Sequence, residues 1–497
     1  MSGSAAPFDP DFLDLPPSSG WLGKLATLVT VVVLGGGLAI LTALYPIVGI
    51  GLTAGLCGLM LVVRLPELLL VAFCVALGIP IQISAVGLPF NAADGILVAW
   101  WACVPLILLC HGPHPWRIPT PVKAVLPFVI AVLISILLAS NPPGQLKQFM
   151  RVVQWFVAVP LAFCVFRPTP RLLRMLGVLL MILPCLFAID GVVEFFNHGN
   201  SISRMLGIPV PAPKDTSSET IHHTFDVSGR AGSTFGGAQG LAIFIDMLIG
   251  FAVAHLLRGP TFLYRLLAVG CLAICGAGLA VAQSRGGYMG AGMVVLIIVS
   301  LMRPRLGKAI ALLAVVGVAV AALVIALWPG WDGTIASLVP GGRADAVIDR
   351  LTIWRTAFAV WRDHPIFGVG LGNFRDHAME RQIDLLEPLG YESFHAHNTY
   401  IEILVDTGLV GLLSYLGFIV TMLVALLRRW RQVRDDRTSH AAIMTMAALG
   451  TLGAYVVFAA VDMLLLENTH MLVVLALTIG LTVPITSSAG PAERAVA

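Results

Sequence analysis

The sequence predicts an all-α fold, a polytopic transmembrane helical bundle of about 12–14 spans with a large, partly helical periplasmic loop. Of the 497 residues, 58% are hydrophobic and only 11% are charged, whereas soluble domains carry about 25% charged residues. A bilayer span needs about 20 apolar residues, so this composition leaves room for a dozen or more spans. The net charge of +3 is too small to indicate a nucleic acid as a partner.

Apolar runs between polar breaks give the individual spans in chain order. The first two are the least well separated, because only Tyr45-Pro46 divides them. The predicted spans lie near residues 25–43, 45–63, 66–86, 95–110, 124–140, 152–166, 175–194, 236–257, 266–283, 287–302, 309–328, 400–427, 441–464 and 469–486.

The basic residues set the expected orientation, because Lys and Arg gather in cytoplasmic loops. With a cytoplasmic N-terminus, most of the 30 Lys and Arg residues fall in inner loops such as 167–174 and 428–437. Most of the others fall in two outer loops, 195–235 and 329–399, so we predict an N-in, C-in protein. The predicted domains are a disordered cytoplasmic tail at 1–22, the transmembrane bundle with its periplasmic loops at 23–486, and a second cytoplasmic tail at 487–497.

The second outer loop contains a predicted helix from Asp345 to Asp363. Its apolar side chains recur three or four residues apart, which is the spacing of one helix face, and Pro365 ends it. We expect this helix to lie against the membrane interface or to cap the bundle. A glycine-rich turn and a shorter helical stretch to about Leu389 follow. The apolar face consists of Val347, Leu351, Trp354, Phe358 and Trp361.

Arg285 is the most informative single residue, because it lies in a short polar break inside an otherwise apolar stretch. An arginine at mid-bilayer costs about 2.5–3.5 kcal/mol on insertion scales, so it is rare and usually functional. The alternative is that Arg285 extends to the outer headgroups at a tight turn. Arg230, flanked by glycines near the start of a span, could reach the same outer surface. Two converging guanidinium groups would bind an anion, and phosphate suits that geometry best.

His397 is predicted to act as a general base at the outer surface, where a hydroxyl acceptor would arrive. Glu402 and Asp406 lie one and two turns deeper on the following helix and are expected to orient it. The alternative is an exposed loop histidine. A metal site is disfavoured, because the pair His395 and His397 lacks a third ligand. The role of His395 stays open.

Asp246 falls about ten residues, or roughly 15 Å at helical rise, into its predicted span. A carboxylate at that depth could serve ion translocation, could pair with a neighbouring helix, or could stay protonated. The sequence leaves these three interpretations open.

Four segments, in this order, resemble the O-antigen ligase and polysaccharide polymerase superfamily of bacterial envelope glycosyltransferases. The resemblance covers residues from about 225 to 425, and the rest of the chain matches only as hydrophobic spans. The segments are GRAGSTF at 229–235, SRGG at 284–287, Arg350-x-x-x-Trp354 followed by PIFGVGLGNF, and HN-x-x-x-x-x-L-x-x-x-G-x-x-G at 397–411.

This resemblance implies a glycosyltransferase of the lipid-carrier type of fold, in the bacterial inner membrane, that uses no metal or other cofactor. Such enzymes move a glycan from an undecaprenyl diphosphate carrier to a hydroxyl acceptor, such as lipid A–core, at the periplasmic face. The matching motifs assign diphosphate binding to Arg230 and Arg285, and catalysis to His397. The residues expected to support them are Arg350, His395, Asn398, Glu402 and Asp406.

Other functions remain open at this point. A ligase, a polysaccharide polymerase and a protein O-glycosylating enzyme would share this constellation and differ in the acceptor. A transporter or flippase is the alternative from another class. It would account for the many spans and for Asp246, but it predicts polar residues and broken helices at mid-membrane. A non-catalytic scaffold would account for neither Arg285 nor the two histidines. The sequence does not indicate the oligomeric state.

Overall fold

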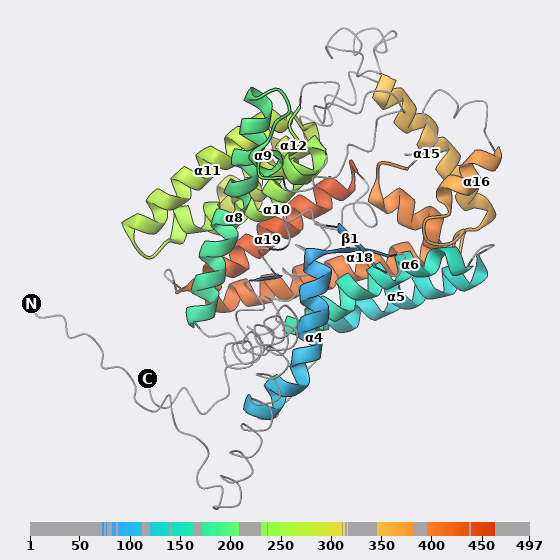
Figure 1. Cartoon of the computed structure of the whole chain (residues 1–497), viewed down its shortest axis with the longest axis horizontal. Coiled ribbons are helices and arrows are strands. Elements are labelled where there is room, and N and C mark those ends of the chain that lie inside the picture. The colour runs from blue at the N-terminus through green and yellow to red at the C-terminus, as the bar shows by residue number, and fades with distance from the viewer. Residues whose placement is uncertain are drawn as a thin grey trace, which may run out of the picture. The chain divides into compact units, whose positions relative to one another are not determined.

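We analysed a computed structural model of the whole chain (Figure 1). Contacts divide the chain into two units, Met1–Pro66 and Glu67–Ala497, and all the residues that the structure describes belong to the second unit. The described residues are 82–85, 88–111, 120–139, 142–163, 170–207, 230–235, 237–310, 345–381, 395–436 and 439–462, together with 72, 73, 76, 312, 313 and 316.

Helix α10 (Ala238–Arg258) is the centre of one group of helices, and most of its side chains are buried. A helix that is apolar on all sides is expected in the middle of a bundle. Gly259 and Pro260 follow directly and end it. The helices in contact with α10 are α8 (Pro170–Phe196), α11 (Phe262–Ala282), α12 (Arg285–Met302) and α19 (His440–Ala459) (Figure 1).

Helix α18 (Thr399–Val433) joins this group to a second one. It packs against α19 and against α5 (Thr120–Leu138). The rings of Phe128 on α5 and Tyr415 on α18 lie 5.2 Å apart between centroids. The buried hydroxyls of Tyr415 and Tyr455 hydrogen-bond α18 to α19. Aromatic packing and this hydroxyl pair therefore fix α18 between its two neighbours.

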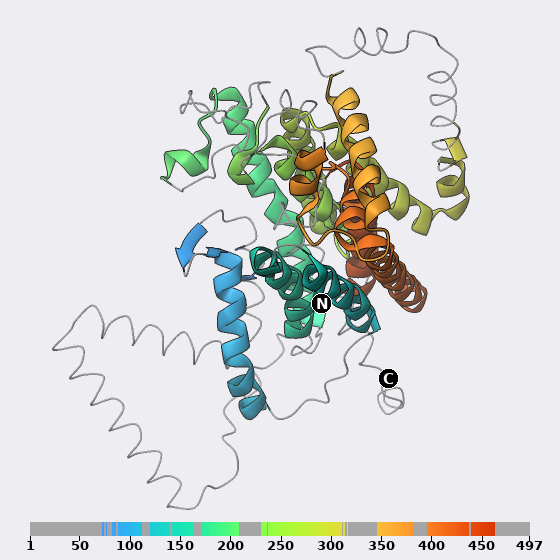
Figure 2. The ribbon, with the colours of Figure 1, turned by 90° about the vertical axis from the view of Figure 1, so that its right-hand side faces the viewer.

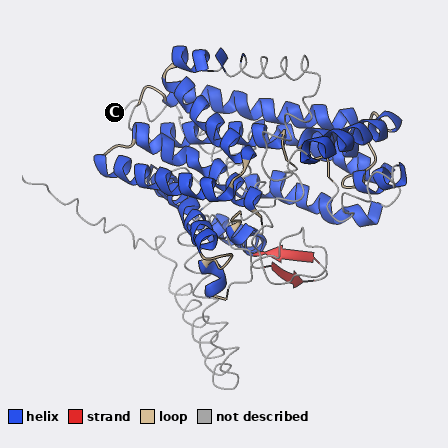
Figure 3. Ribbon diagram, turned by 90° about the horizontal axis from the view of Figure 1, so that it is seen from above, coloured by secondary structure: helices blue, strands red, loops and turns tan. Residues whose placement is uncertain are grey.

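The N-terminal part that the structure describes begins with a short antiparallel hairpin (Figure 3). Strands β1 (Gln82–Ala85) and β2 (Leu88–Asn91) pair with Gln82 opposite Asn91. Helix α4 (Ala92–His111) follows directly. The hairpin departs from the all-helical prediction. The predicted span near 66–86 is wrong at its end, because β1 occupies that segment.

The sequence stretch near 152–166 was predicted as one span, and its described part, up to residue 163, is helical throughout but contains a π-helical turn. A π-helical turn interrupts the helix there, and such turns are rare outside functional or strained positions. Buried Asp94 on α4 anchors the same stretch, since it accepts hydrogen bonds from Arg151 at 2.8 Å and Gln154 at 2.5 Å. The pieces are α6 (Pro142–Val153), the π-helical turn η2 (Gln154–Ala158) and α7 (Val159–Phe163).

Seven helices in the described part of the chain are long and apolar enough to cross a membrane. The protein is therefore a polytopic α-helical membrane protein, as predicted. The seven correspond to the predicted spans near 124–140, 175–194, 236–257, 266–283, 287–302, 400–427 and 441–464, and α4 covers the one near 95–110. The predictions that lie outside the described residues are the tails 1–22 and 487–497 and the spans near 25–43, 45–63, 469–486 and most of 66–86 and 309–328.

Helix α15 (Asp345–Asp363) has the predicted bounds. Its buried side chains are Ile353, Thr356, Ala357 and Val360, whereas Phe358 of the predicted apolar face is 40% exposed. Trp354 and Trp361 of that face pack at the edge of the buried cluster. Small side chains such as Ala357 let α15 approach α18 and α16 (Phe374–Arg381) closely, so they occupy the contact, and α15 caps the start of α18 (Figure 2).

Helix α18 is broken near its start, at Gly408, which has φ +67 and ψ −170. The segment that precedes α16 fills the break. The amide groups of Leu409 and Val410 donate to the carbonyl groups of Pro365 and Ile366, at 2.9 and 3.2 Å. A Cβ at Gly408 would overlap the Ile366 backbone, so only glycine fits here. The break separates residues 399–407 from the long apolar part of α18.

Candidate functional site

The four motif segments meet at one end of the bundle, which we call the site end. It is the end where α8, α11 and α19 finish and where α10, α12 and α18 begin. Backbone hydrogen bonds join segments that are distant in sequence: Ala231 N donates to Val281 O, and Thr399 N donates to Asp462 O, each at 3.2 Å. The residues predicted to form one site therefore lie on segments that are in direct contact.

Arg230 begins the first motif turn and is half-buried. Residues 231–235 of this turn are held by two carboxylates from the end of α8. Glu194 Oε2 accepts from the amides of Gly232 at 2.9 Å and Ser233 at 2.6 Å. Asp190 Oδ2 accepts from the Ser233 hydroxyl at 2.7 Å. The backbone that carries Arg230 is thus tied to α8 as well as to the end of α11.

Arg285 is the first residue of α12 and is exposed. The preceding helix ends at Gln283, which adopts a left-handed conformation with φ +46, and the Ser284 hydroxyl then caps α12 by accepting from Gly287 N at 3.2 Å. The exposed amides and the dipole of a helix N-terminus favour an anion, and a guanidinium at the same point adds to that attraction. This turn places Arg285 at a helix start and not in the middle of the bilayer.

The charges of Arg285 and Asp462 both act on the Arg350 guanidinium. Burial lowers the pKa of the Arg350 guanidinium, the Asp462 carboxylate opposes this shift, and Arg285 adds to it. Two guanidinium groups therefore act on one region, beside a single carboxylate. Such a region attracts a group with more than one negative charge.

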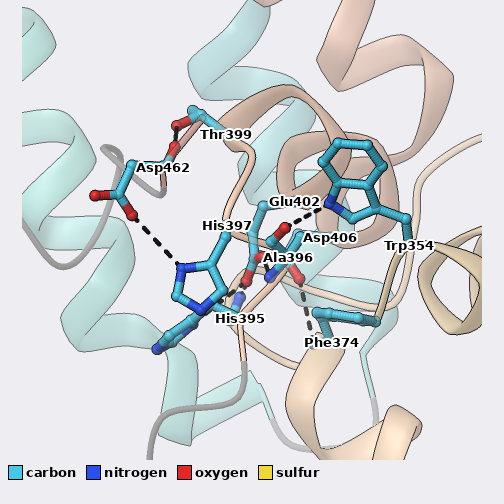
Figure 4. A network of polar contacts seen from close by, with 10 residues as sticks. Trp354, Phe374, His395, Ala396, His397, Thr399, Glu402, Asp406 and Asp462 are labelled. Carbon is cyan, nitrogen blue, oxygen red and sulfur yellow. Dashed lines mark hydrogen bonds and ion pairs between the residues drawn. The ribbon is translucent and has the colours of Figure 1, made fainter. Parts of the chain in front are cut away.

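His397 faces the end of α19. Its Nδ1 lies 3.7 Å from Asp462 Oδ1 (Figure 4), and its backbone has φ +47, which is rare for a residue other than glycine. Its neighbours fix this geometry. Asn398 caps α18 by accepting from Tyr400 N at 3.0 Å, and it donates through Nδ2 to Ala460 O at 2.9 Å.

His395 faces a different carboxylate. Its Nδ1 lies 3.7 Å from Glu402 Oε1, while Glu402 Oε2 accepts from Ala396 N at 2.7 Å (Figure 4). Trp354 of α15 donates to Ala396 O at 2.7 Å, so the segment between the two histidines is held from both sides. In the part of the chain that the structure describes, no group of three or more His, Cys, Asp and Glu side chains is placed to hold a metal ion.

Asp406 was expected to orient His397, and its contacts lie elsewhere. Its carboxylate accepts from Gly372 N at 2.7 Å and from Phe374 N at 3.2 Å, so it fixes the glycine-rich loop before α16. Its carbonyl oxygen accepts from Gly370 N at 2.9 Å. Within this motif, Glu402 holds the histidine turn and Asp406 holds the loop.

The residue that pairs with His397 is Asp462, which the sequence analysis missed. Its carbonyl oxygen accepts from the Thr399 hydroxyl at 2.8 Å, and its side chain is nearly buried. The signal was an acidic residue near the end of an apolar span, which is uncommon and often functional. Its partner could not be found from sequence, because the pairing depends on how α18 and α19 meet.

Asp246 lies in α10, outside the histidine and arginine cluster, and is fully buried. Among the residues that the structure describes, neither of its carboxylate oxygens has a hydrogen-bond partner. A Cβ at Gly290 of α12 would overlap Asp246 Oδ2, so the carboxyl group lies directly against the backbone of α12.

Comparison with known protein families gives one match, over residues 270–416, to the family model described as O-antigen ligase. Comparison with curated proteins finds no match. The family match contains Arg285, Arg350 and His397, whereas Arg230 and Asp462 lie on either side of it. It confirms the family resemblance drawn from the sequence motifs.

Proposed function

We propose that this chain transfers a glycan from undecaprenyl diphosphate to a hydroxyl acceptor, and the match of residues 270–416 to the O-antigen ligase family model supports this proposal. In this proposal the protein lies in the bacterial inner membrane with both termini in the cytoplasm, so that the site end faces the periplasm. The acceptor is lipid A–core or a similar molecule. The observation that carries the proposal is the meeting of Arg285, Arg350 and the His397–Asp462 pair at one end of the bundle.

The arginines would bind the diphosphate. Arg285 is close enough to Arg350 to lower the pKa of the Arg350 guanidinium, and the turn that carries Arg230 is hydrogen-bonded to the end of α11, just before Arg285. As the bond from the anomeric carbon to the diphosphate breaks, negative charge develops on the leaving group. Fixed guanidinium groups stabilise that charge without a metal ion.

His397 would remove the proton of the acceptor hydroxyl. Nδ1 lies 3.7 Å from the Asp462 carboxylate, and a small approach of the two groups would let Nδ1–H donate to it, which would leave Nε2 to accept the proton. The acceptor oxygen then attacks the anomeric carbon from the side opposite the diphosphate, which inverts that centre. Asp462 would stabilise the imidazolium formed in this step.

The experiment is a transfer assay with purified protein, an undecaprenyl diphosphate-linked glycan and candidate acceptors. His397→Ala and Arg285→Ala should abolish transfer and leave the protein inserted in the membrane. His440→Ala is the matched control, because His440 begins α19 at the opposite end of the bundle. Chelators should have no effect. Full activity of either site variant would overturn the proposal.

The same assay tests the alternatives. A polysaccharide polymerase would extend a second lipid-linked repeat unit in preference to lipid A–core, and a protein O-glycosylating enzyme would modify a polypeptide hydroxyl. A transporter or flippase, for which buried Asp246 is the motivating observation, would move the carrier across vesicles without forming a bond.

A further inference from the structure

Two carboxylates, those of Asp190 and Glu194, lie one helical turn apart near the end of α8, and we call them the carboxylate clamp. Asp190 is 4% exposed and Glu194 is 1% exposed. Placing two carboxylates near each other away from water is unfavourable unless donors surround them. Such a pair in a membrane helix calls for a specific explanation.

The donors come from the turn at 231–235 and from the short helix α9 (Ile202–Met205). Glu194 binds the amides of Gly232 and Ser233. Asp190 binds the Ser233 hydroxyl through Oδ2 and the Ser203 amide, at 2.8 Å, through Oδ1. Both clamp residues therefore contact Ser233, and these bonds join α8 to α9 and to the turn at 231–235.

The Arg204 guanidinium interacts electrostatically with both clamp carboxylates. Burial lowers the pKa of the Arg204 guanidinium, and the charges of Glu194 and Asp190 oppose that shift. Arg204 is itself fixed, because it donates to the Gly199 carbonyl at 2.8 Å. Arg204 thus offsets part of the negative charge of the two carboxylates.

The turn that the clamp holds is one the chain would not adopt unaided. Ser233 has φ +53, a left-handed conformation that is costly for a residue with a Cβ. Gly232 has no room for a side chain, since a Cβ there would lie 2.8 Å from Gly237 N. Backbone strain of this kind persists only where the surroundings enforce it. Here Glu194 and Asp190 supply the enforcing contacts.

We infer that Asp190 and Glu194 are positioning residues, which fix the turn at 231–235 so that Arg230 meets the diphosphate of the lipid carrier. This inference rests on the proposed function, and it adds that the carboxylate clamp positions Arg230. Glu194 acts on the two amides that follow Ala231, and Ala231 is itself bonded to the end of α11. The position of Arg230 relative to Arg285 therefore depends on the clamp.

The test is a double-mutant cycle on the full chain in nanodiscs, with undecaprenyl diphosphate as the probe and its Kd as the readout. Glu194→Gln keeps the shape and removes the charge. Loss of charge-assisted hydrogen bonds should weaken binding about tenfold. In the Arg230→Ala background, the same Glu194→Gln substitution should have no further effect, because the clamp acts through Arg230.

Two control variants separate positioning from general destabilisation. Ser233→Ala removes only the bond from its hydroxyl to Asp190 and should weaken binding less than Glu194→Gln does. Asp94→Asn removes another buried carboxylate, one that pairs with Arg151, and should leave the Kd unchanged. Equal weakening by Glu194→Gln in both backgrounds, or no weakening in either, would overturn the inference.

Hydrogen exchange at Gly232 and Ser233 separates failure of this inference from failure of the proposed function. If the clamp holds the turn, Glu194→Gln should accelerate exchange of these two amides at least about tenfold. Unchanged exchange in a protein that binds the probe overturns the clamp alone. If the unmodified protein does not bind undecaprenyl diphosphate, the proposed function falls, and the purpose assigned to the clamp falls with it.

Discussion

The two ends of the bundle are built in different ways. At the site end, carboxylates bind backbone amides: Glu194 holds one turn, Glu402 holds the histidine turn, and Asp406 holds the glycine-rich loop. Left-handed residues stand in the first two of these turns, Ser233 in one and His397 in the other. The site end therefore fixes the course of its backbone, which is what a site that must present several side chains at set positions requires.

At the opposite end, side chains contact side chains. The Arg258 guanidinium lies over the Trp430 ring, 4.8 Å from its centroid, and donates to the Asp436 carbonyl at 3.4 Å. The rings of His255 and Tyr264 are stacked with centroids 6.0 Å apart. These contacts hold α10, α11 and α18 together without unusual backbone conformations at the residues named. The difference teaches that left-handed residues and carboxylates bound to backbone amides mark the site end, whereas ring contacts and the hydrogen bond of Arg258 join the helices at the other end.

Among substitutions that compare the two ends, Asp462→Asn should lower the transfer rate most. Asparagine retains the backbone carbonyl that binds Thr399 but loses the charge that faces His397. A base that loses the carboxylate orienting it typically loses about two to four orders of magnitude in kcat. The measurement is the transfer rate per inserted molecule.

Asp436→Asn is the matched control for Asp462→Asn at the opposite end, because asparagine retains the backbone carbonyl that accepts from Arg258. It should transfer at the unmodified rate. If both substitutions leave the rate unchanged, the pairing of Asp462 with His397 has no catalytic role.

A smaller but structural effect is expected from Gly408→Ala. The left-handed backbone costs a residue with a Cβ about 1–3 kcal/mol, and the added Cβ would also overlap the Ile366 backbone. We expect a lower melting temperature and a lower yield of monodisperse protein. Gly417→Ala in the same helix meets open space and should melt at or above the unmodified temperature. Equal melting of the two variants would show that the break tolerates a side chain.

The smallest effect is expected from Arg258→Gln. Removal of the contact with Trp430 should cost about 0.5–2 kcal/mol of stability. Transfer per folded molecule should stay within about twofold of the unmodified rate. This variant sharpens the comparison, because a loss of activity like that of Arg285→Ala would mean that the two ends are not functionally separate.

The sequence predicted the helices well and their contacts less well. The seven spans and the bounds of α15 follow from local patterns, because an apolar run between polar breaks, or a recurrence every three or four residues, depends only on neighbours in the chain. The side chains that α15 buries were not predicted one by one, because large side chains dominate the periodicity. Close packing instead selects small ones, such as Ala357.

The sequence predicted residues of the candidate site, but it did not predict which of them contact each other. Arg285 and His397 stood out because charged and imidazole groups are rare beside apolar spans. The pairing of His397 with Asp462 and the binding of Asp406 to Gly372 arise from contacts between distant segments. No local pattern distinguishes Glu402, which holds the histidine turn, from Asp406, which holds the loop.

The break at Gly408 also restricts how a substrate can enter. Across it, residues 365–370 and the start of α18 exchange backbone hydrogen bonds in both directions, since Val369 N donates to Val405 O at 3.0 Å while Leu409 N donates to Pro365 O. Swinging this loop aside would leave those amides and carbonyls unpaired in a low-dielectric setting, at about 1–3 kcal/mol each. The loop is therefore a fixed wall and not a lid, and under the proposed function the donor and the acceptor would have to reach His397 by a route along it.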